Sequence, residues 1–129
     1  MKVRGLTFVG TSTDAREPMA AFVRDVLGLS SVPVEGSGHD FFALPDGSTF
    51  AVGPSGGPDA SGGDSRTIGF LVDDVDEAAA ELRAAGVPAD DEVSANARYR
   101  YTHFRAPDGH VYELVERLQP SADAARLRG

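Results

Sequence analysis

The chain has 129 residues, no cysteine, 12 basic and 20 acidic residues, and a formal net charge of −8. An acidic chain is not expected to bind nucleic acid, and no apolar run approaches the roughly 20 residues needed to span a bilayer. Without cysteine, disulfides and thiolate metal sites are excluded; since no signal-peptide pattern is visible either, we expect a cytoplasmic location.

The first half of the chain predicts a strand, a helix and three further strands. A β-like segment near 3–10 leads into a helix expected over about 14–27, which is capped by residues 12–14 and ended by Gly28. Apolar side chains at helical spacing predict a stripe that packs on a sheet: Met19, Phe22, Val23, Val26 and Leu27. The three further strands are expected near 31–35, 39–44 and 48–53.

The second half repeats this order. A strand near 66–72 precedes an Ala-rich helix over about 75–85 that ends at Gly86. Three more strands are expected near 91–94, 98–105 and 110–116. A segment rich in Gly, Pro and Ser, about 54–65, is typical of a linker, and the tail at 118–129 is expected to form at most a short helix.

The two halves also share a turn followed by a strand, at 44–52 and 106–114, each with the sequence Pro-Asp-Gly. Matched landmarks are nearly equally spaced, because Thr7 and Thr67 are 60 residues apart and Asp46 and Asp108 are 62 apart. The chain is therefore interpreted as a single domain built from two βαβββ modules, about 1–53 and about 66–117.

The second turn also predicts which residues face each other. A hairpin centred on Asp108 pairs His103 with Glu113. Strand alternation then separates two faces of this hairpin. One face carries Tyr99, Tyr101, His103, Arg105, Val111, Glu113 and Val115, and the helix-covered face carries Phe104, Tyr112 and Leu114.

Three segments, 22–29, 70–75 and 107–114, together resemble the vicinal oxygen chelate superfamily, which includes glyoxalase I, extradiol dioxygenases and bleomycin-binding proteins. The resemblance covers about residues 3–117. It implies an α+β fold in which tandem βαβββ modules form a cupped mixed β-sheet, with the ligand held in the cup.

The same resemblance implies where a metal would be bound. Metal-dependent members take ligands from the first and last strands of each module, which correspond here to Thr7, Ala51, Thr67 and Glu113. Only Glu113 is a good ligand, whereas Zn, Fe and Mn sites need several imidazole or carboxylate groups. No metal cofactor is therefore expected, and His39 and His110 are not expected to be ligands because they lack spaced partners.

The candidate site residues come from the predicted inner face. Glu113 and His103 are the candidate catalytic pair, with Glu113 as ligand acceptor or general base, because a carboxylate in an apolar strand needs a partner. The alternative is a purely structural pair, satisfied by each other or by a threonine. The other candidate ligand-binding residues are Thr7, Thr67, Tyr99, Tyr101 and Arg105.

Two classes of function follow from this site. The favoured one is binding of a small organic molecule in the cup, such as sequestration of an aromatic or cationic antibiotic. The alternative is a metal-dependent lyase, isomerase or dioxygenase of the same superfamily, with ligands such as His103 or His39. Because each module exposes an apolar sheet face, a homodimer is expected as well.

Overall fold

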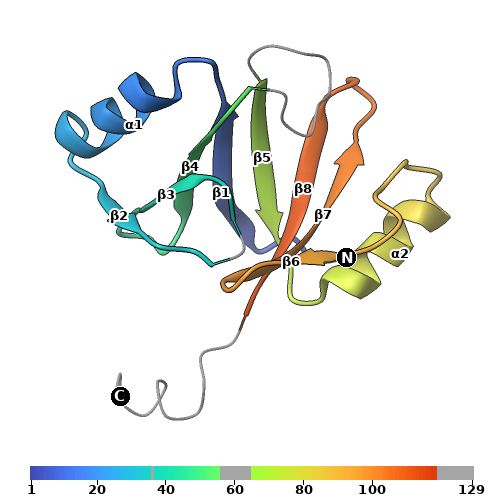
Figure 1. Ribbon diagram of the computed structural model, residues 1–129. Helices are drawn as coiled ribbons and strands as arrows, with labels where there is room; N and C mark the ends of the chain where they lie inside the picture. Colours follow the sequence, from blue (N-terminus) through green and yellow to red (C-terminus); the bar gives the residue numbers. More distant parts are fainter. Residues whose placement is uncertain (36, 56–64, 119–129) are drawn as a thin grey trace, which may run out of the picture.

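The computed structural model describes residues 1–35, 37–55 and 65–118 and contains an eight-stranded mixed sheet with two helices (Figure 1). Most of the expected linker at 54–65 and nearly all of the expected tail at 118–129 lie outside the described residues. Within the described residues, no helix is long and apolar enough to cross a membrane.

Each module contributes half of the sheet. The first contains β1 (Gly5–Ser12), α1 (Arg16–Asp25), β2 (Ser30–Val32), β3 (Asp40–Ala43) and β4 (Thr49–Gly53). The second contains β5 (Ser65–Leu71), α2 (Val75–Ala84), β6 (Ser94–Ala95), β7 (Tyr99–Arg105) and β8 (Val111–Arg117). The strand order is β2-β3-β4-β1-β5-β8-β7-β6, so the two modules join within one chain through antiparallel β1 and β5.

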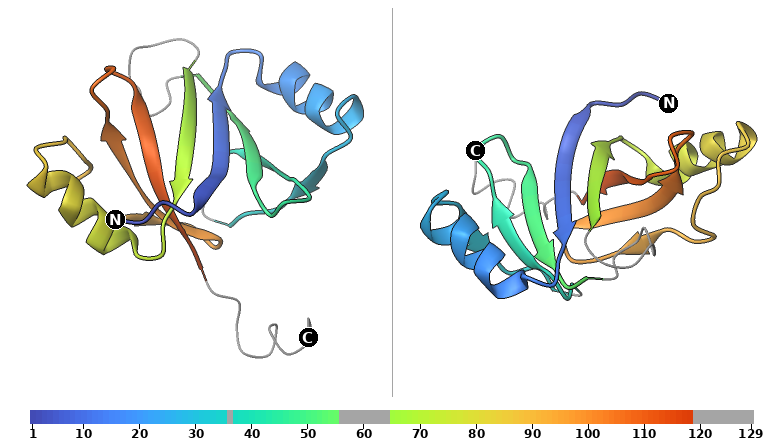
Figure 2. Two further views of the ribbon diagram at one scale, coloured as in Figure 1. Left: turned by 180° about the vertical axis from the view of Figure 1, so that it is seen from behind. Right: turned by 90° about the horizontal axis from the view of Figure 1, so that it is seen from above.

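The sheet is curved, and the two helices lie at its opposite ends (Figures 1 and 2). Each helix covers an apolar cluster of its own module. Val23 of α1 packs with Phe42 and Val52 of the sheet, and Val75 and Ala78 of α2 pack with Leu114. A third cluster, built on Phe41, Ala51, Tyr99 and Val115, lies on the opposite, inner face of the sheet. On the outer side of the sheet α1 contacts β3 and β4, and α2 contacts β7 and β8, while the inner side carries the cup.

The turn predictions are confirmed in both modules. Gly47 and Gly109 have positive φ angles of 86° and 85°, a conformation that glycine adopts without strain. Asp46 Oδ1 accepts from the amide of Ser48, and Asp108 Oδ1 accepts from the amide of His110. These Asx turns explain why the same three residues recur before β4 and before β8.

The first helix is shorter than expected. It runs over Arg16–Asp25 rather than 14–27, and its N-cap is Ala15, whose methyl group cannot accept a hydrogen bond. Thr13, one of the predicted capping residues, instead accepts from the Ala15 amide before the helix begins. The predicted stripe is only partly buried. Val23 is fully buried, whereas Phe22, Val26 and Leu27 are 45%, 70% and 55% exposed. The amides of Val26 and Leu27 both donate to Phe22 O, so the chain leaves α-helical geometry before the stripe is complete.

The second helix agrees better with the sequence. Asp74 caps it by accepting from the Glu77 amide, and Val75, Ala78 and Ala79 are buried as expected. The strand expected near 91–94 is wrong, however. The chain pairs with β7 once at Ala89 and again at Ser94–Ala95, and the residues between these pairings lie outside any strand.

Candidate functional site

The inner face of the sheet forms an open cavity of about 140 Å³ to which both modules contribute. Its walls combine four Phe and Tyr rings with hydroxyl, amide, imidazole and carboxylate groups, as is common for small-molecule sites. The lining residues are Phe8, Gly10, Thr11, Ser12, Ser37, His39, Phe41, Thr67, Asn96, Tyr99, Tyr101, His103, Glu113 and Val115.

The predicted pairing across the second hairpin is confirmed. His103 on β7 lies directly opposite Glu113 on β8, and Tyr101 lies opposite Val115. All four residues line the cavity, while Leu114 and Phe104 pack under α2 on the other face. The local geometry of the turn was therefore enough to place the candidate catalytic pair in the cup.

His103 contacts two carboxylates at once. Its Nε2 lies 2.8 Å from Glu113 Oε2, and its Nδ1 lies 2.9 Å from Asp90 Oδ2. Glu113 is only 8% exposed, whereas the side chain of Asp90 is 41% exposed. The three side chains thus form a chain that leads from the wall of the cavity to the protein surface.

These contacts change the proton affinity of the ring. Burial alone would lower the pKa of His103, but the contacts with Glu113 and then with Asp90 outweigh it, and the pKa is raised above its ordinary value of 6.5. The opposite shift occurs at His39, where burial and then the charge of Arg16 lower the pKa, against smaller effects of Glu113 and Asp40.

A test of this electrostatic arrangement is the pH dependence of stability. Because the pKa of His103 is raised in the folded protein, its contribution to stability is full below about pH 6.5 and is lost as the pH rises through the folded pKa. Between pH 5.5 and pH 8.5 the free energy of unfolding of the wild type should therefore fall by the contribution of His103. We expect this contribution to the fall to be absent in His103→Gln, as measured by urea unfolding at both pH values. His39→Gln serves as the control, because a lowered histidine pKa contributes in the opposite direction, so its removal cannot mimic the result. An unchanged pH profile in His103→Gln would contradict the raised pKa.

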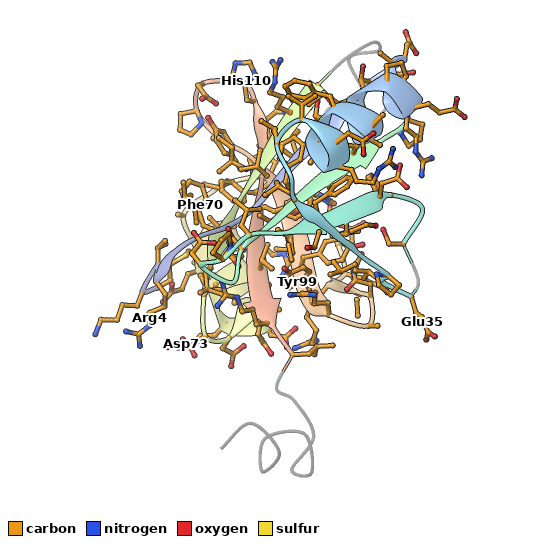
Figure 3. The ribbon with its side chains drawn as sticks, turned by 90° about the vertical axis from the view of Figure 1, so that its left-hand side faces the viewer. Arg4, Glu35, Phe70, Asp73, Tyr99 and His110 are labelled. Carbon is orange, nitrogen blue, oxygen red and sulfur yellow. The ribbon has the colours of Figure 1, made fainter. Side chains whose placement is uncertain are left out.

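The two predicted tyrosines contribute differently. Tyr99 is 3% exposed and its hydroxyl lies 2.9 Å from Thr49 Oγ1, so its polar end is already satisfied by the protein. Figure 3 shows Tyr99 in the interior of the molecule, whereas His110 lies at one end of it. Tyr101 contacts the His103 ring edge-on at 5.6 Å, and burial, then Glu113 and Asp90, raise its pKa. Tyr101 thus differs from Tyr99 in being only partly buried while lining the same cavity.

Two of the predicted ligand-binding residues do not line the cavity. Thr7 is fully buried, and its Oγ1 accepts hydrogen bonds from Nε and Nη2 of Arg117 at 3.0 and 2.7 Å. Arg105 is exposed at the end of β7, and its Nη1 donates to the carbonyl of Gly109. Thr67, in contrast, lines the cavity as predicted.

The reason for the error at Thr7 is an irregularity in the register of β1. Leu6 pairs with Phe70 and Phe8 pairs with Gly69, so Thr7 is the extra residue of a bulge. Gly10 pairs with Ala51 in β4, and Gly69 pairs with Glu113 in β8. Because Ala51 and Glu113 are matched positions of the repeat, Gly10 corresponds to Gly69, and Phe8, two residues earlier, corresponds to Thr67. The residue that corresponds to Thr67 is therefore Phe8, whose ring lines the cavity.

With this correction, the four positions that the resemblance carries over are Phe8, Ala51, Thr67 and Glu113. An aromatic ring, a methyl group, a hydroxyl and one carboxylate do not provide the donors of a Zn, Fe or Mn site. Nor does the described part of the chain bring together three or more His, Asp or Glu side chains that could hold an ion. The residues present do not fit the metal of the superfamily.

The sequence interpretation missed Asp90 behind the cavity wall and several polar lining residues: Thr11, Ser12, Ser37, His39 and Asn96. Asp90 lies 13 residues from His103, outside any strand, so no local pattern places it there. His39 was considered only as a metal ligand, but its ring lines the cavity and packs on Gly53, where a Cβ atom would lie 2.2 Å from His39 Cδ2. Gly53 was the available signal, because a glycine inside a strand often marks such a close approach.

Comparison with known proteins identifies a family for this chain. A family model described as Glyoxalase/Bleomycin resistance protein/Dioxygenase superfamily matches residues 9–114. No curated protein matches the sequence significantly.

Similar solved structures share the fold at low sequence identity. Methylmalonyl-CoA epimerase from Mycobacterium tuberculosis is 22% identical with a TM-score of 0.71, covering 96% of this chain and 93% of that one. A hypothetical protein from Bacillus halodurans is 21% identical with a TM-score of 0.70, covering 90% and 96%. Streptomyces coelicolor methylmalonyl-CoA epimerase in complex with 2-nitronate-propionyl-CoA is 22% identical with a TM-score of 0.66, covering 89% and 98%.

Proposed function

Because this chain belongs to the glyoxalase/bleomycin resistance protein/dioxygenase superfamily, we propose that it binds a small organic molecule in the cup of its sheet, without a metal ion. The observation that carries the proposal is a carboxylate, Glu113, in the wall of an aromatic cavity, with one oxygen engaged by His103. Among the described residues none is hydrogen-bonded to Glu113 Oε1, which is the atom available to a ligand.

The size and charge of the cavity define the ligand class. A volume of about 140 Å³ suits a molecule of one ring, since an apolar protein cavity of about 150 Å³ holds benzene. The aromatic walls favour a planar body, and Glu113 favours a polar end that donates hydrogen bonds. With Asp90 and Glu113 beside one imidazole, a cationic end is preferred to an anionic one.

Three matched probes test the proposal: benzylamine, benzyl alcohol and benzoate share one ring and differ in the charge of the polar end. We expect benzylamine to bind best and benzoate not at all, as measured by isothermal titration calorimetry and by NMR shifts of His103 and Tyr101. Binding of benzoate in preference to benzylamine, or shifts confined to residues outside the cavity, would contradict the proposal.

Metal content is a separate prediction. Because the positions of the superfamily's ligands are occupied by Phe8, Ala51 and Thr67 beside Glu113, we expect the purified protein to hold no stoichiometric divalent ion. Elemental analysis of protein purified without chelators measures this directly. About one Zn, Fe, Mn or Ni per chain that is lost in Glu113→Gln would overturn the prediction.

Catalysis as a lyase, isomerase or dioxygenase is the second candidate, favoured by one observation. Glu113 and His103 are a proton acceptor and a proton donor 2.8 Å apart in the same cavity. The solved epimerases suggest methylmalonyl-CoA as the first substrate to assay, with and without added Co²⁺ or Mn²⁺. Turnover that disappears in Glu113→Gln would favour catalysis over binding alone.

Sequestration of an antibiotic is the more specific form of the binding function that we propose. The description of the superfamily includes bleomycin resistance proteins, and antibiotics with planar cationic groups match the cavity in chemistry. Since a chain without cysteine needs no oxidising compartment, we also propose a cytoplasmic location.

We propose that the protein is a homodimer. Apolar side chains of α1 that do not reach its own sheet support this, since Phe22, Val26 and Leu27 are 45% or more exposed. Phe22 also borders a groove between α1 and the outer face of the sheet, lined by Met19, Phe50 and Arg66. One copy therefore offers exposed apolar side chains next to a groove, which can form a self-complementary patch for a two-fold contact between identical chains.

Light scattering at micromolar concentration is expected to give twice the chain mass of 13.5 kDa. Phe22→Asp should shift the protein towards the monomer, because the contact would then bury an unpaired charge. Ala84→Asp, at an exposed position of α2, is the matched control and should leave the mass unchanged. A stable wild-type monomer would contradict the proposal.

A further inference from the structure

Asp90 is held against His103 by the backbone as well as by its side chain. The amide of Asp90 donates to His103 O, and the amide of Arg105 donates to Pro88 O, so residues 88–90 run along the edge of β7. In addition, Nη2 of Arg83 donates to the carbonyl of Asp90 at 2.6 Å. These bonds leave the Asp90 carboxylate little freedom to move away from the ring.

The Asp90 carboxylate accepts twice from the same residue. Asp90 Oδ2 lies 3.0 Å from the backbone amide of His103 and 2.9 Å from its ring Nδ1. Since a carboxylate offers only acceptors, Nδ1 must carry its proton in this arrangement. Asp90 therefore fixes the proton on Nδ1, the ring nitrogen that faces away from the cavity.

The other ring nitrogen then determines the charge of the ring. With Nδ1 protonated, a neutral ring would direct the lone pair of Nε2 at Glu113 Oε2, only 2.8 Å away. Protonation of Nε2 replaces this repulsion by a charge-assisted contact. The geometry consequently favours a doubly protonated ring between two carboxylates.

We propose that Asp90 is the positioning residue of this site: it keeps the His103 ring in its doubly protonated form and so sets the charge that Glu113 presents to a ligand. The proposal rests on the binding function proposed for the cavity. It makes Asp90 a determinant of charge selectivity without direct contact with the ligand, since Asp90 is not among the residues that line the cavity.

The other groups that act on this ring and its partner carboxylate are few. Tyr101 packs edge-on against the ring from the same strand, and Glu113 faces it from β8. On the first module, His39 interacts with Glu113 through its charge and is itself affected by Arg16. Of these groups, only Asp90 and Glu113 contact the ring nitrogens directly.

The first experiment needs no ligand. NMR titration of the His103 ring in the full chain, assigned by its loss in His103→Gln, gives its midpoint in the wild type and in two variants. We expect Asp90→Asn to lower the midpoint and Asp91→Asn, an exposed neighbouring carboxylate, to leave it unchanged. Asp90→Ser provides the same comparison if Asp90→Asn does not fold. An unchanged midpoint in the Asp90 variants would overturn the proposal.

The second experiment uses benzylamine between pH 5.5 and pH 7.5. In Asp90→Asn the ring should lose its proton at a lower pH than in the wild type, because the charge of Asp90 no longer stabilises the protonated form. Once the ring is neutral the Glu113 charge is unbalanced, and affinity for the cation should rise about tenfold, the effect expected of one charge a few ångströms away. The wild type and Asp91→Asn should show this rise only at a higher pH. Identical pH profiles in Asp90→Asn and the wild type would overturn the effect on the ligand. If no form binds benzylamine, the proposed function fails, and the NMR titration still decides the role of Asp90.

Discussion

Replacing Glu113 with glutamine is expected to weaken binding of benzylammonium by about 1–3 kcal/mol, or roughly 5- to 150-fold. The substitution removes the charge that receives the ligand's polar end but keeps the shape of the side chain. Glutamine can still accept from Nε2 of His103 through its carbonyl oxygen, so the hairpin should remain folded. Calorimetric titration of both proteins under the same conditions measures the difference.

The matched control for this result is Glu92→Gln, which removes the same charge from an exposed residue that does not line the cavity. It should change the affinity little, since an exposed charge at a distance is screened by salt. Equal affinities in wild type and Glu113→Gln, or an equal loss in Glu92→Gln, would contradict the role assigned to Glu113. The His103–Glu113 pair would then be a structural element of the hairpin.

The neighbouring substitution, Leu114→Ala, is expected to affect stability instead of binding. Leu114 is 2% exposed and packs with Val72, Val75 and Ala78 under α2. Truncating a buried leucine typically lowers the free energy of unfolding by about 2–5 kcal/mol. The transfer free energy of the removed atoms is lost, and the void that they leave under α2 costs packing energy as well. Urea unfolding measures the loss, and the folded fraction should still bind benzylammonium.

The control for Leu114→Ala is Leu118→Ala, just beyond the end of β8, where the side chain is 39% exposed. Its effect should stay within about 0.5 kcal/mol, as is usual at partly exposed surface positions. The two predictions together test the alternation of β8, since residue 113 faces the cup and residue 114 faces the helix. A loss of binding without a loss of stability in Leu114→Ala would mean that this assignment of faces is wrong.

Asp90 is proposed to act on the ligand only through His103, whereas Glu113 contacts the ligand directly. Binding measurements at several pH values can separate these two roles. Glu113→Gln should weaken a cationic probe at every pH, whereas Asp90→Asn should change how affinity depends on pH. The two substitutions therefore separate the residue that accepts the ligand from the residue that sets the charge of its partner.

Features that depend on local geometry were determined by the sequence alone. The Pro-Asp-Gly turns recur with the same backbone conformation at Gly47 and Gly109, and the turn before β8 sets the register that pairs His103 with Glu113. Alternation along β7 and β8 then assigns Tyr101, His103, Glu113 and Val115 to the cup and Phe104 and Leu114 to the helix side. The repeat of turns and helices was likewise enough to predict the paired modules and the family.

Features that depend on segments far apart in the chain were decided only by the tertiary structure. The bulge at Thr7 arises where β1 meets β5, and it exchanges Thr7 for Phe8 in the cavity wall. The contact of Asp90 with His103 depends on where the chain after α2 meets the edge of β7. The position of His39 depends in the same way on its packing against Gly53. A turn fixes register through bonds within a few residues, whereas these placements depend on packing between distant elements. Even at Gly53, where the glycine indicates a close approach, the sequence does not say which residue approaches.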